Sequence, residues 1–211
     1  MTQPALIFDF GNVFAFFDYT RMGTTLGKSL GLSGEQFLDR IRQAGFTPLL
    51  QAYESGKMPA EEFGQAVCAL VGLELSHDEF ASAWRDIFWL NEPVVKLIAD
   101  LRASGYTLVL GSNTNELHAT HFLQQFAEAL APFHHLVLSY KVGQIKPATS
   151  FYLACAKAAG EAPEACIFID DLPENVAGAN AAGLRGVLFQ DVPTLKDDLR
   201  QLGVDLTGIA R

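Results

Sequence analysis

Leu6-Ile7-Phe8-Asp9-Phe10-Gly11-Asn12-Val13 joins an apolar run to a single carboxylate. Four consecutive apolar residues, beginning at Ala5, are typical of a strand buried on both faces of a parallel sheet. Such a strand delivers its next residue, Asp9, to the carboxyl edge of the sheet, where open α/β sheets bind ligands. Gly11 and Asn12 tolerate backbone angles that bulkier residues avoid, so the chain can turn sharply there. We therefore take Asp9 as the candidate centre of the chemistry.

The size and composition are those of a globular protein. The chain has 211 residues, enough for one large domain or for a core domain with an insertion. Its 49% hydrophobic and 18% charged residues are typical of a folded rather than a disordered chain. No apolar run approaches the roughly 20 residues that a membrane helix needs, and no basic, apolar leader precedes the first strand. We expect a cytoplasmic protein with no membrane partner.

The charge and the cysteines exclude several classes of protein. A formal net charge of -9 argues against nonspecific binding of nucleic acid, which depends on clustered Lys and Arg. An anionic substrate would therefore need a local attraction, either a metal ion or a few placed cations. Cys68, Cys155 and Cys166 are scattered without a CxxC spacing, which predicts buried thiols rather than a disulfide framework or a zinc site. These features do not distinguish a monomer from a homodimer.

The order of the predicted elements indicates an α/β fold with an insertion. We expect a mostly helical insertion from about Phe14 to Asn91. After Tyr19 the sequence carries helix signals, such as the capping box that begins at Ser76, and no convincing strand. Beyond Asn91 helices alternate with strands expected at residues 107–110, 135–138, 166–169 and 185–189. This alternation predicts a parallel sheet with helices on both faces. We predict a Rossmann-like, doubly wound core made of residues 1–13 and 92–211, with an inserted α-helical cap domain at residues 14–91.

Polar residues follow three of the predicted strands at the same edge of the sheet. They are Asp9, Ser112 with Asn113, and Asp170 with Asp171, while Lys146 lies on the loop between the last two pairs. Carboxylates that converge in this way repel one another, so a divalent cation is their natural partner. Magnesium suits an all-oxygen site that water and a substrate phosphate complete. The metal and Lys146 would supply the local positive charge that the chain otherwise lacks.

These residues resemble the haloacid dehalogenase superfamily. Its four ordered motifs are similar to Asp9-Phe10-Gly11-Asn12-Val13, Ser112-Asn113, Lys146-Pro147, and Ile169-Asp170-Asp171 followed by Asn175. The resemblance covers nearly the whole chain, including a helical cap after the first motif. It implies that the Asp9 carboxylate attacks phosphorus to give an aspartyl-phosphate, which water then hydrolyses.

The same resemblance implies the roles of the other residues. Magnesium would be held by the Asp9 carboxylate, the Gly11 carbonyl and Asp171. Asp170 and Asn175 would support this site, either by contacting the metal directly or by holding the residues that do. Ser112 and the backbone around Asn113 would donate hydrogen bonds to the phosphate of a small phosphate ester. Lys146 would offset the repulsion between carboxylate and phosphate.

Gly11 departs from the usual pattern of the superfamily's phosphatases. They carry a second Asp at this position, which protonates the leaving oxygen, a contribution typically worth about 10²- to 10⁴-fold. A similar Asp-x-Gly-Asn-Val form occurs in the superfamily members that resemble α-D-glucose-1-phosphate phosphatase and the N-terminal phosphatase domain of epoxide hydrolases. This likeness implies a sugar phosphate or another small phosphate ester as substrate. We hypothesise that a cap residue, a bound water or a good leaving group replaces the missing acid.

Two other functions stay open at this point. In a metal-independent 2-haloacid dehalogenase an equivalent Asp attacks carbon, and Gly11 is compatible with that reaction. Against it, Asp170-Asp171 is a metal-binding arrangement, whereas dehalogenases carry largely uncharged residues there. A noncatalytic binding protein could keep the fold and use the cap surface for a partner. The presence of Asp9, Ser112, Lys146 and Asp171 together argues against lost chemistry and favours the phosphatase.

Overall fold

The computed structural model describes residues 3–209 and contains a central parallel sheet. Its strands are β1 (Ala5–Phe8), β4 (Leu108–Ser112), β5 (His135–Leu138), β6 (Cys166–Asp170) and β7 (Arg185–Leu188), in the order β5-β4-β1-β6-β7. All four strand pairs are parallel. The central position of β1 explains why all four of its residues are apolar and buried.

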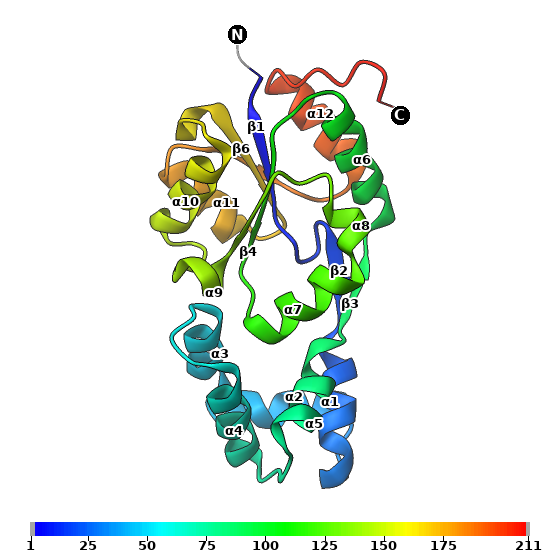
Figure 1. The fold of residues 1–211 in the computed structure, drawn as a ribbon, viewed down its shortest axis with the longest axis vertical. Helices are drawn as coiled ribbons and strands as arrows, with labels where there is room; N and C mark the ends of the chain where they lie inside the picture. The colour runs from blue at the N-terminus through cyan, green and yellow to red at the C-terminus, as the bar shows by residue number, and fades with distance from the viewer. Residues whose placement is uncertain (1–2, 210–211) are drawn as a thin grey trace.

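Helices cover both faces of this sheet, so the predicted doubly wound fold is confirmed (Figure 1). Side chains alternate along β1: Leu6 and Phe8 enter one apolar core, whereas Ala5 and Ile7 enter the other. The first core is closed by α6 (Glu92–Ala103), α7 (Glu116–Gln125), α8 (Ala127–Leu130) and α12 (Val192–Gln201). The second is closed by α10 (Thr149–Ala159) and α11 (Pro173–Ala181). Two short pieces, α9 (Ser139–Val142) and the 3-10 helix η2 (Pro163–Ala165), complete the connections.

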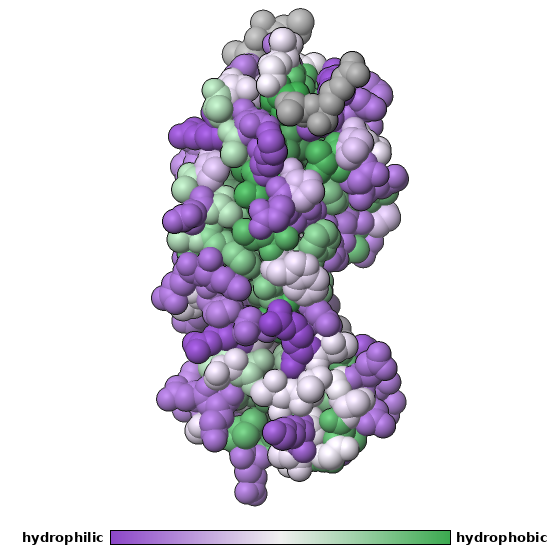
Figure 2. All heavy atoms as spheres, turned by 90° about the vertical axis from the view of Figure 1, so that its right-hand side faces the viewer, coloured by the Kyte–Doolittle hydropathy of each residue, from purple (hydrophilic) through white to green (hydrophobic). Residues whose placement is uncertain are grey.

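A helical lobe lies beyond the carboxyl edge of the sheet (Figure 1). It contains α1 (Tyr19–Gly27), the 3-10 helix η1 (Lys28–Leu30), α2 (Gly34–Gln43), α3 (Phe46–Glu54), α4 (Ala60–Val71) and α5 (His77–Arg85). Serine capping boxes start α2 and α5, at Ser33 and Ser76. The lobe has its own aromatic centre, in which the Phe63 ring packs edge-on against Trp84 at 4.9 Å. We call this lobe the cap; Figure 2 shows a narrower waist between it and the core lobe.

The chain crosses between the two lobes through a short antiparallel ribbon, where no strand was expected. β2 (Ala15–Phe17) pairs with β3 (Phe88–Leu90), and Phe16 lies opposite Trp89. The expectation of no convincing strand after Tyr19 was wrong at β3, and β2 was not predicted. Three-residue strands are too short to show a period of two, and their pairing joins residues far apart in sequence.

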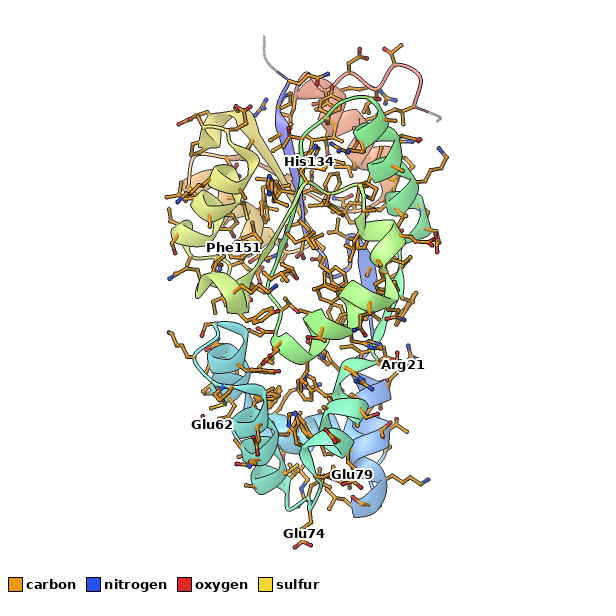
Figure 3. All side chains as sticks on the ribbon, viewed as in Figure 1. Arg21, Glu62, Glu74, Glu79, His134 and Phe151 are labelled. Carbon is orange, nitrogen blue, oxygen red and sulfur yellow. The ribbon has the colours of Figure 1, made fainter. Side chains whose placement is uncertain are left out.

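Exposed acidic residues account for part of the negative charge. The glutamates Glu62, Glu74 and Glu79 lie on the outer surface of the cap, where water solvates them (Figure 3). The three cysteines are buried and free, as predicted. No helix within residues 3–209 is long and apolar enough to cross a membrane.

Candidate active site

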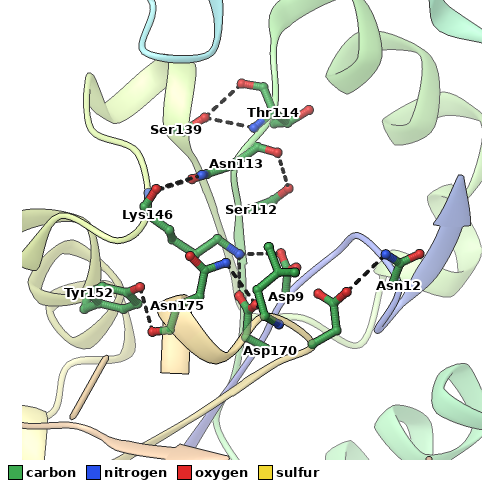
Figure 4. Close-up of polar contacts among 12 residues, drawn as sticks. Asp9, Asn12, Ser112, Asn113, Thr114, Ser139, Lys146, Tyr152, Asp170 and Asn175 are labelled. Carbon is green, nitrogen blue, oxygen red and sulfur yellow. Dashed lines mark hydrogen bonds and ion pairs between the residues drawn. The ribbon is translucent and has the colours of Figure 1, made fainter. Parts of the chain in front are cut away.

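The ends of three neighbouring strands place the candidate site residues together. Ser112 and Asp170 are the last residues of β4 and β6, the two strands that flank β1. Asp9 follows β1 directly, and its N–H donates to the Ile169 carbonyl at 2.9 Å. Because parallel strands end at the same edge, these side chains converge at the carboxyl edge of the sheet (Figure 4). The sequence placed Ser112 and Asp170 just beyond the strands, and the structure includes them as the final strand residues.

Lys146 lies at the centre of this cluster. Its ammonium nitrogen, Nζ, is 2.7 Å from a carboxylate oxygen of Asp9 and 2.7 Å from one of Asp170. The Lys146 side chain is only 2% exposed. Burial alone would lower the pKa of Lys146, but the two adjacent carboxylates outweigh it and raise that pKa. Lys146 therefore stays charged inside the site.

The side-chain amide of Asn113 fixes the backbone that carries this lysine. Asn113 Oδ1 accepts a hydrogen bond from the Lys146 N–H at 2.8 Å, and Asn113 Nδ2 donates to the Lys146 carbonyl at 3.1 Å. The amide thus bridges the end of β4 and the loop before α10. Both polar atoms of the Asn113 side chain are therefore engaged with the Lys146 backbone.

Asp170 is saturated by donors from the protein. Its Oδ1 accepts from the Leu172 N–H at 3.0 Å and from Asn175 Nδ2 at 2.9 Å, and its Oδ2 accepts from Lys146. The Tyr152 hydroxyl in turn donates to the Asn175 carbonyl at 2.8 Å. Asp170 and Asn175 therefore form a rigid buried support beneath Lys146.

Asp171 is the more accessible member of the pair. It is half-buried, and its Oδ2 accepts a hydrogen bond from Asn12 Nδ2 at 3.1 Å. Asn12 has a positive φ of 54°, the left-handed conformation that asparagine tolerates in tight turns. The sharp turn predicted after Asp9 is thus present, and it aims an amide at Asp171.

The carboxylates form a candidate cation site. Ligand oxygens of Asp9, Asp170 and Asp171 all lie within 4.8 Å of one another. Lys146 supplies a single positive charge against these three acids. Burial raises the pKa of Asp9 to about 7, with Lys146 opposing that shift, and burial also raises the pKa of Asp171. A hard divalent cation would compensate the excess negative charge, and the all-oxygen donor set fits magnesium.

A side chain at position 11, where the family pattern places an acid, would be crowded by a ring of the ribbon. A Cβ atom built on Gly11 would lie 3.0 Å from the Phe17 ring, closer than ordinary van der Waals contact. Phe17 belongs to β2, the first strand of the ribbon to the cap. The ribbon therefore occupies the space beside Asp9 that a longer side chain would need.

The cap and the ribbon close the site into a cavity of about 230 Å³. Asp9, Ser112, Lys146 and Asp171 line it from the core. The opposite wall is formed by Phe17, Tyr19, Glu54, Phe88 and His118. Phe17 of the ribbon and Tyr19 at the start of α1 both line the cavity.

Glu54 and His118 were missed as lining residues. Glu54 is the last residue of α3 and is followed by Ser55 and Gly56. This pattern indicates only that a helix ends there. His118 lies in the first turn of α7, a helix of the core. It is buried, its ring stacks on Trp84 of the cap, and its Nε2 lies 3.1 Å from the Trp84 carbonyl. No local signal reveals that either side chain faces Asp9.

The fold and the site define a class: an α/β protein whose carboxylate-centred site lies between a parallel sheet and a helical cap. Residues 5–183 match the family model of haloacid dehalogenase-like hydrolases. The chain belongs to the haloacid dehalogenase-like hydrolase family. The resemblance stated from the motifs, and with it the assignment as a hydrolase, is confirmed.

Three relatives illustrate the likeness. A D-ribitol-5-phosphate phosphatase of Bacteroides thetaiotaomicron is 32% identical over 180 residues, covering 81% of this chain and 84% of that protein. A phosphatase of Mycobacterium tuberculosis is 29% identical over 217 residues, covering 99% of each chain. The solved structure of a family enzyme from B. thetaiotaomicron, in complex with magnesium and inorganic phosphate, has a TM-score of 0.76 at 23% identity and covers 92% of this chain and 99% of that one.

Proposed function

We propose that this chain is a magnesium-dependent phosphatase that hydrolyses a small phosphorylated metabolite through an aspartyl-phosphate on Asp9. The observation that carries the proposal is the environment of the Asp9 carboxylate, which is buried at the sheet edge, 2.7 Å from Lys146 and within a cluster of three acids. The relatives named as phosphatases support the same class of reaction.

The core residues supply the chemistry of the first step. A carboxylate oxygen of Asp9 attacks phosphorus, and the bond from phosphorus to the ester oxygen breaks. Lys146, held by Asn113, balances the negative charge that the phosphate brings into the cavity. The Ser112 hydroxyl and the backbone N–H groups around Asn113 donate hydrogen bonds to the phosphate oxygens. Water then attacks the phosphorus and releases inorganic phosphate and Asp9.

The Asp9 carboxylate, the Gly11 carbonyl and Asp171 would hold the magnesium ion. Asp170 lies close enough to join them, but its contacts to Lys146, Leu172 and Asn175 favour an indirect role. When bound, magnesium neutralises phosphate charge and lowers the cost of bringing two anions together.

The cavity favours a small substrate with one phosphate group. Its volume of about 230 Å³ is below the roughly 300–1,000 Å³ of typical pockets for drug-sized ligands. A sugar or polyol phosphate fits this limit, and a ribitol phosphate is the substrate named for one relative. The cytoplasmic location expected from the sequence stays a prediction.

The test is phosphate release from a panel that contains glucose 1-phosphate, ribitol 5-phosphate and p-nitrophenyl phosphate, with magnesium or with chelator. We expect magnesium-dependent turnover that Asp9→Asn abolishes and that Asp171→Asn weakens by lowering the affinity for magnesium. Asp86→Asn, an exposed acid of the cap, is the matched control and should leave turnover unchanged.

Other outcomes would favour the other functions. Gly11 is compatible with a dehalogenase, in which the second Asp is also absent, so 2-chloropropionate belongs in the same panel. Chloride release without added metal would replace the phosphatase by a dehalogenase. Absence of turnover on every ester and haloacid would leave a binding protein with the family fold.

A further inference from the structure

The proposed reaction needs proton transfers to which no residue has yet been assigned. The ester oxygen that leaves phosphorus needs a proton, and the attacking water must lose one. Gly11 cannot do either, because it has no side chain. If the protein itself supplies this proton carrier, the carrier lies elsewhere on the wall of the cavity.

Glu54 is the carboxyl group that the cap contributes to this wall. It ends α3, it lines the same cavity as Asp9 and Lys146, and its carboxylate interacts electrostatically with the Lys146 ammonium. Within residues 3–209, no protein group donates a hydrogen bond to the Glu54 carboxylate or pairs with it as an ion. Glu54 is half-buried, and a carboxylate at the cavity wall without a protein partner is available to a ligand.

Two contacts tie Glu54 to the core. The Ser139 hydroxyl donates to the Glu54 carbonyl at 2.6 Å, and the same hydroxyl oxygen accepts from the Thr114 N–H at 2.9 Å. Gly56 lies so close to the core that a Cβ on it would be 2.2 Å from the Tyr140 carbonyl oxygen. The end of α3 is therefore seated on the core at the closed site.

The charge state of Glu54 suits proton transfer in both directions. Burial raises its pKa from 4.5 to about 7, with the Lys146 ammonium opposing the shift. The other titratable group that interacts with it from the cap is Tyr19, whose own pKa is raised by burial. Near neutral pH the Glu54 carboxyl can donate a proton and, once ionised, accept one.

The other titratable groups on the wall are less suitable. Burial lowers the pKa of His118 to about 3, and both its ring nitrogens already have partners in Asn115 and Trp84. Tyr19 keeps its proton because its pKa is raised. Lys146 is held by two carboxylates, and Asp171 belongs to the proposed magnesium site.

We infer that Glu54 is the general acid and base that replaces the residue missing at position 11; the inference rests on the proposed phosphatase function. In the first step Asp9 oxygen bonds to phosphorus, the ester bond breaks, and the Glu54 O–H proton moves to the departing oxygen to give the alcohol. In the second step the Glu54 carboxylate takes a proton from water as that water attacks phosphorus. The bond from phosphorus to Asp9 breaks, and phosphate leaves with Glu54 protonated again.

The test compares two leaving groups in wild type and Glu54→Gln. An alkyl phosphate, such as ribitol 5-phosphate, expels a strongly basic oxygen that needs the proton, whereas p-nitrophenyl phosphate expels a stable anion that does not. We expect Glu54→Gln to lower kcat/KM for the alkyl ester by about 10²- to 10⁴-fold. For p-nitrophenyl phosphate, kcat/KM should change only a few-fold, which also shows that the variant folds.

The second step gives an independent readout. Without its base, Glu54→Gln should release a rapid burst of one p-nitrophenol per active site, followed by slow turnover as the aspartyl-phosphate accumulates. Glu62→Gln, an exposed glutamate of the same cap, is the control and should match wild type on both esters.

The outcomes separate the two proposals. No turnover by wild type on any ester would overturn the phosphatase function itself. Turnover by wild type with equal losses on both esters in Glu54→Gln, or with no loss on either, would overturn only the role of Glu54.

Discussion

Lys146 shows how a single buried charge organises the site. It has two carboxylate partners at 2.7 Å, and its backbone is held on both sides by the amide of Asn113. Its side chain is 2% exposed, so water cannot replace either partner. Removing one member of a buried ion pair leaves the other charges uncompensated, which costs far more than the pair itself contributes.

We therefore expect Lys146→Met to lower the free energy of unfolding by roughly 3–5 kcal/mol, because Asp9 and Asp170 then face each other without a cation. Lys96→Met is the matched control. Lys96 also lies 2.7 Å from an acid, Asp100, but its side chain is 64% exposed, so the change should stay within about 0.5 kcal/mol. Urea denaturation in chelator measures both.

A second substitution checks the cause of that loss. Adding Asp9→Asn to Lys146→Met removes one of the opposed carboxylates and should restore part of the stability. A double variant no more stable than Lys146→Met would contradict the electrostatic explanation.

The end of α3 is the element that brings the cap to the core. The Glu54 carbonyl accepts from Ser139, and Gly56 packs against the Tyr140 carbonyl of α9. Gly56 has a φ of +68°, which glycine adopts without strain. A side chain at position 56 would clash with the core. It would also have to adopt a left-handed backbone conformation that residues other than glycine disfavour.

Gly31 and Gly56 allow these two effects to be separated, because both have a φ of +68° and only Gly56 has a neighbour within 4 Å. Gly31→Ala should lower stability by roughly 1–2 kcal/mol, the cost of the left-handed conformation, with kcat/KM unchanged. Gly56→Ala should cost more and should also lower kcat/KM, because it moves Glu54 away from the cavity. Equal stability and equal kcat/KM in the two variants would show that the end of α3 is not seated on the core.

At the scale of the whole molecule, His118 joins the two lobes. It lies on α7 of the core, stacks on Trp84 of the cap with ring centroids 5.5 Å apart, and hydrogen-bonds to the Trp84 carbonyl. Asn115 Nδ2 lies 3.1 Å from its Nδ1, which suits a neutral ring that donates from Nε2. Protonation of this ring would place an unpaired charge inside the joint between core and cap.

This predicts a pH dependence of stability. Burial lowers the pKa of His118 in the folded protein from 6.5 to about 3, so between these values the unfolded state binds one more proton than the folded state. Stability should therefore fall as the pH falls below about 6.5, and His118 should contribute up to ~1.4 kcal/mol per pH unit.

His118→Gln should remove this part of the slope when the free energy of unfolding is measured between pH 7 and 4. His77→Gln, at the exposed start of α5, should keep it. A slope that His118→Gln leaves unchanged would contradict the neutral, buried histidine.

Much of the core and of its catalytic edge could be predicted from the sequence. The apolar run ending at Phe8 predicted the central strand, since only strands buried on both faces are apolar without alternation. Asp9, Ser112 and Asp170 were expected to converge because parallel strands end at one edge, and Lys146 was expected beside them. These signals are local in sequence, and the parallel topology needs no further information to bring them together.

The tertiary structure alone decided the far wall of the cavity and the crossing between the lobes. Glu54 and His118 carry no local signal, because their orientation depends on how the cap helices pack on one another and on the core. The pairing of β2 with β3 joins residues more than seventy positions apart, and the Phe17 ring beside Gly11 depends on that pairing. Local sequence patterns determined the elements and the charged edge of the sheet, whereas contacts between distant segments decided which side chains face Asp9.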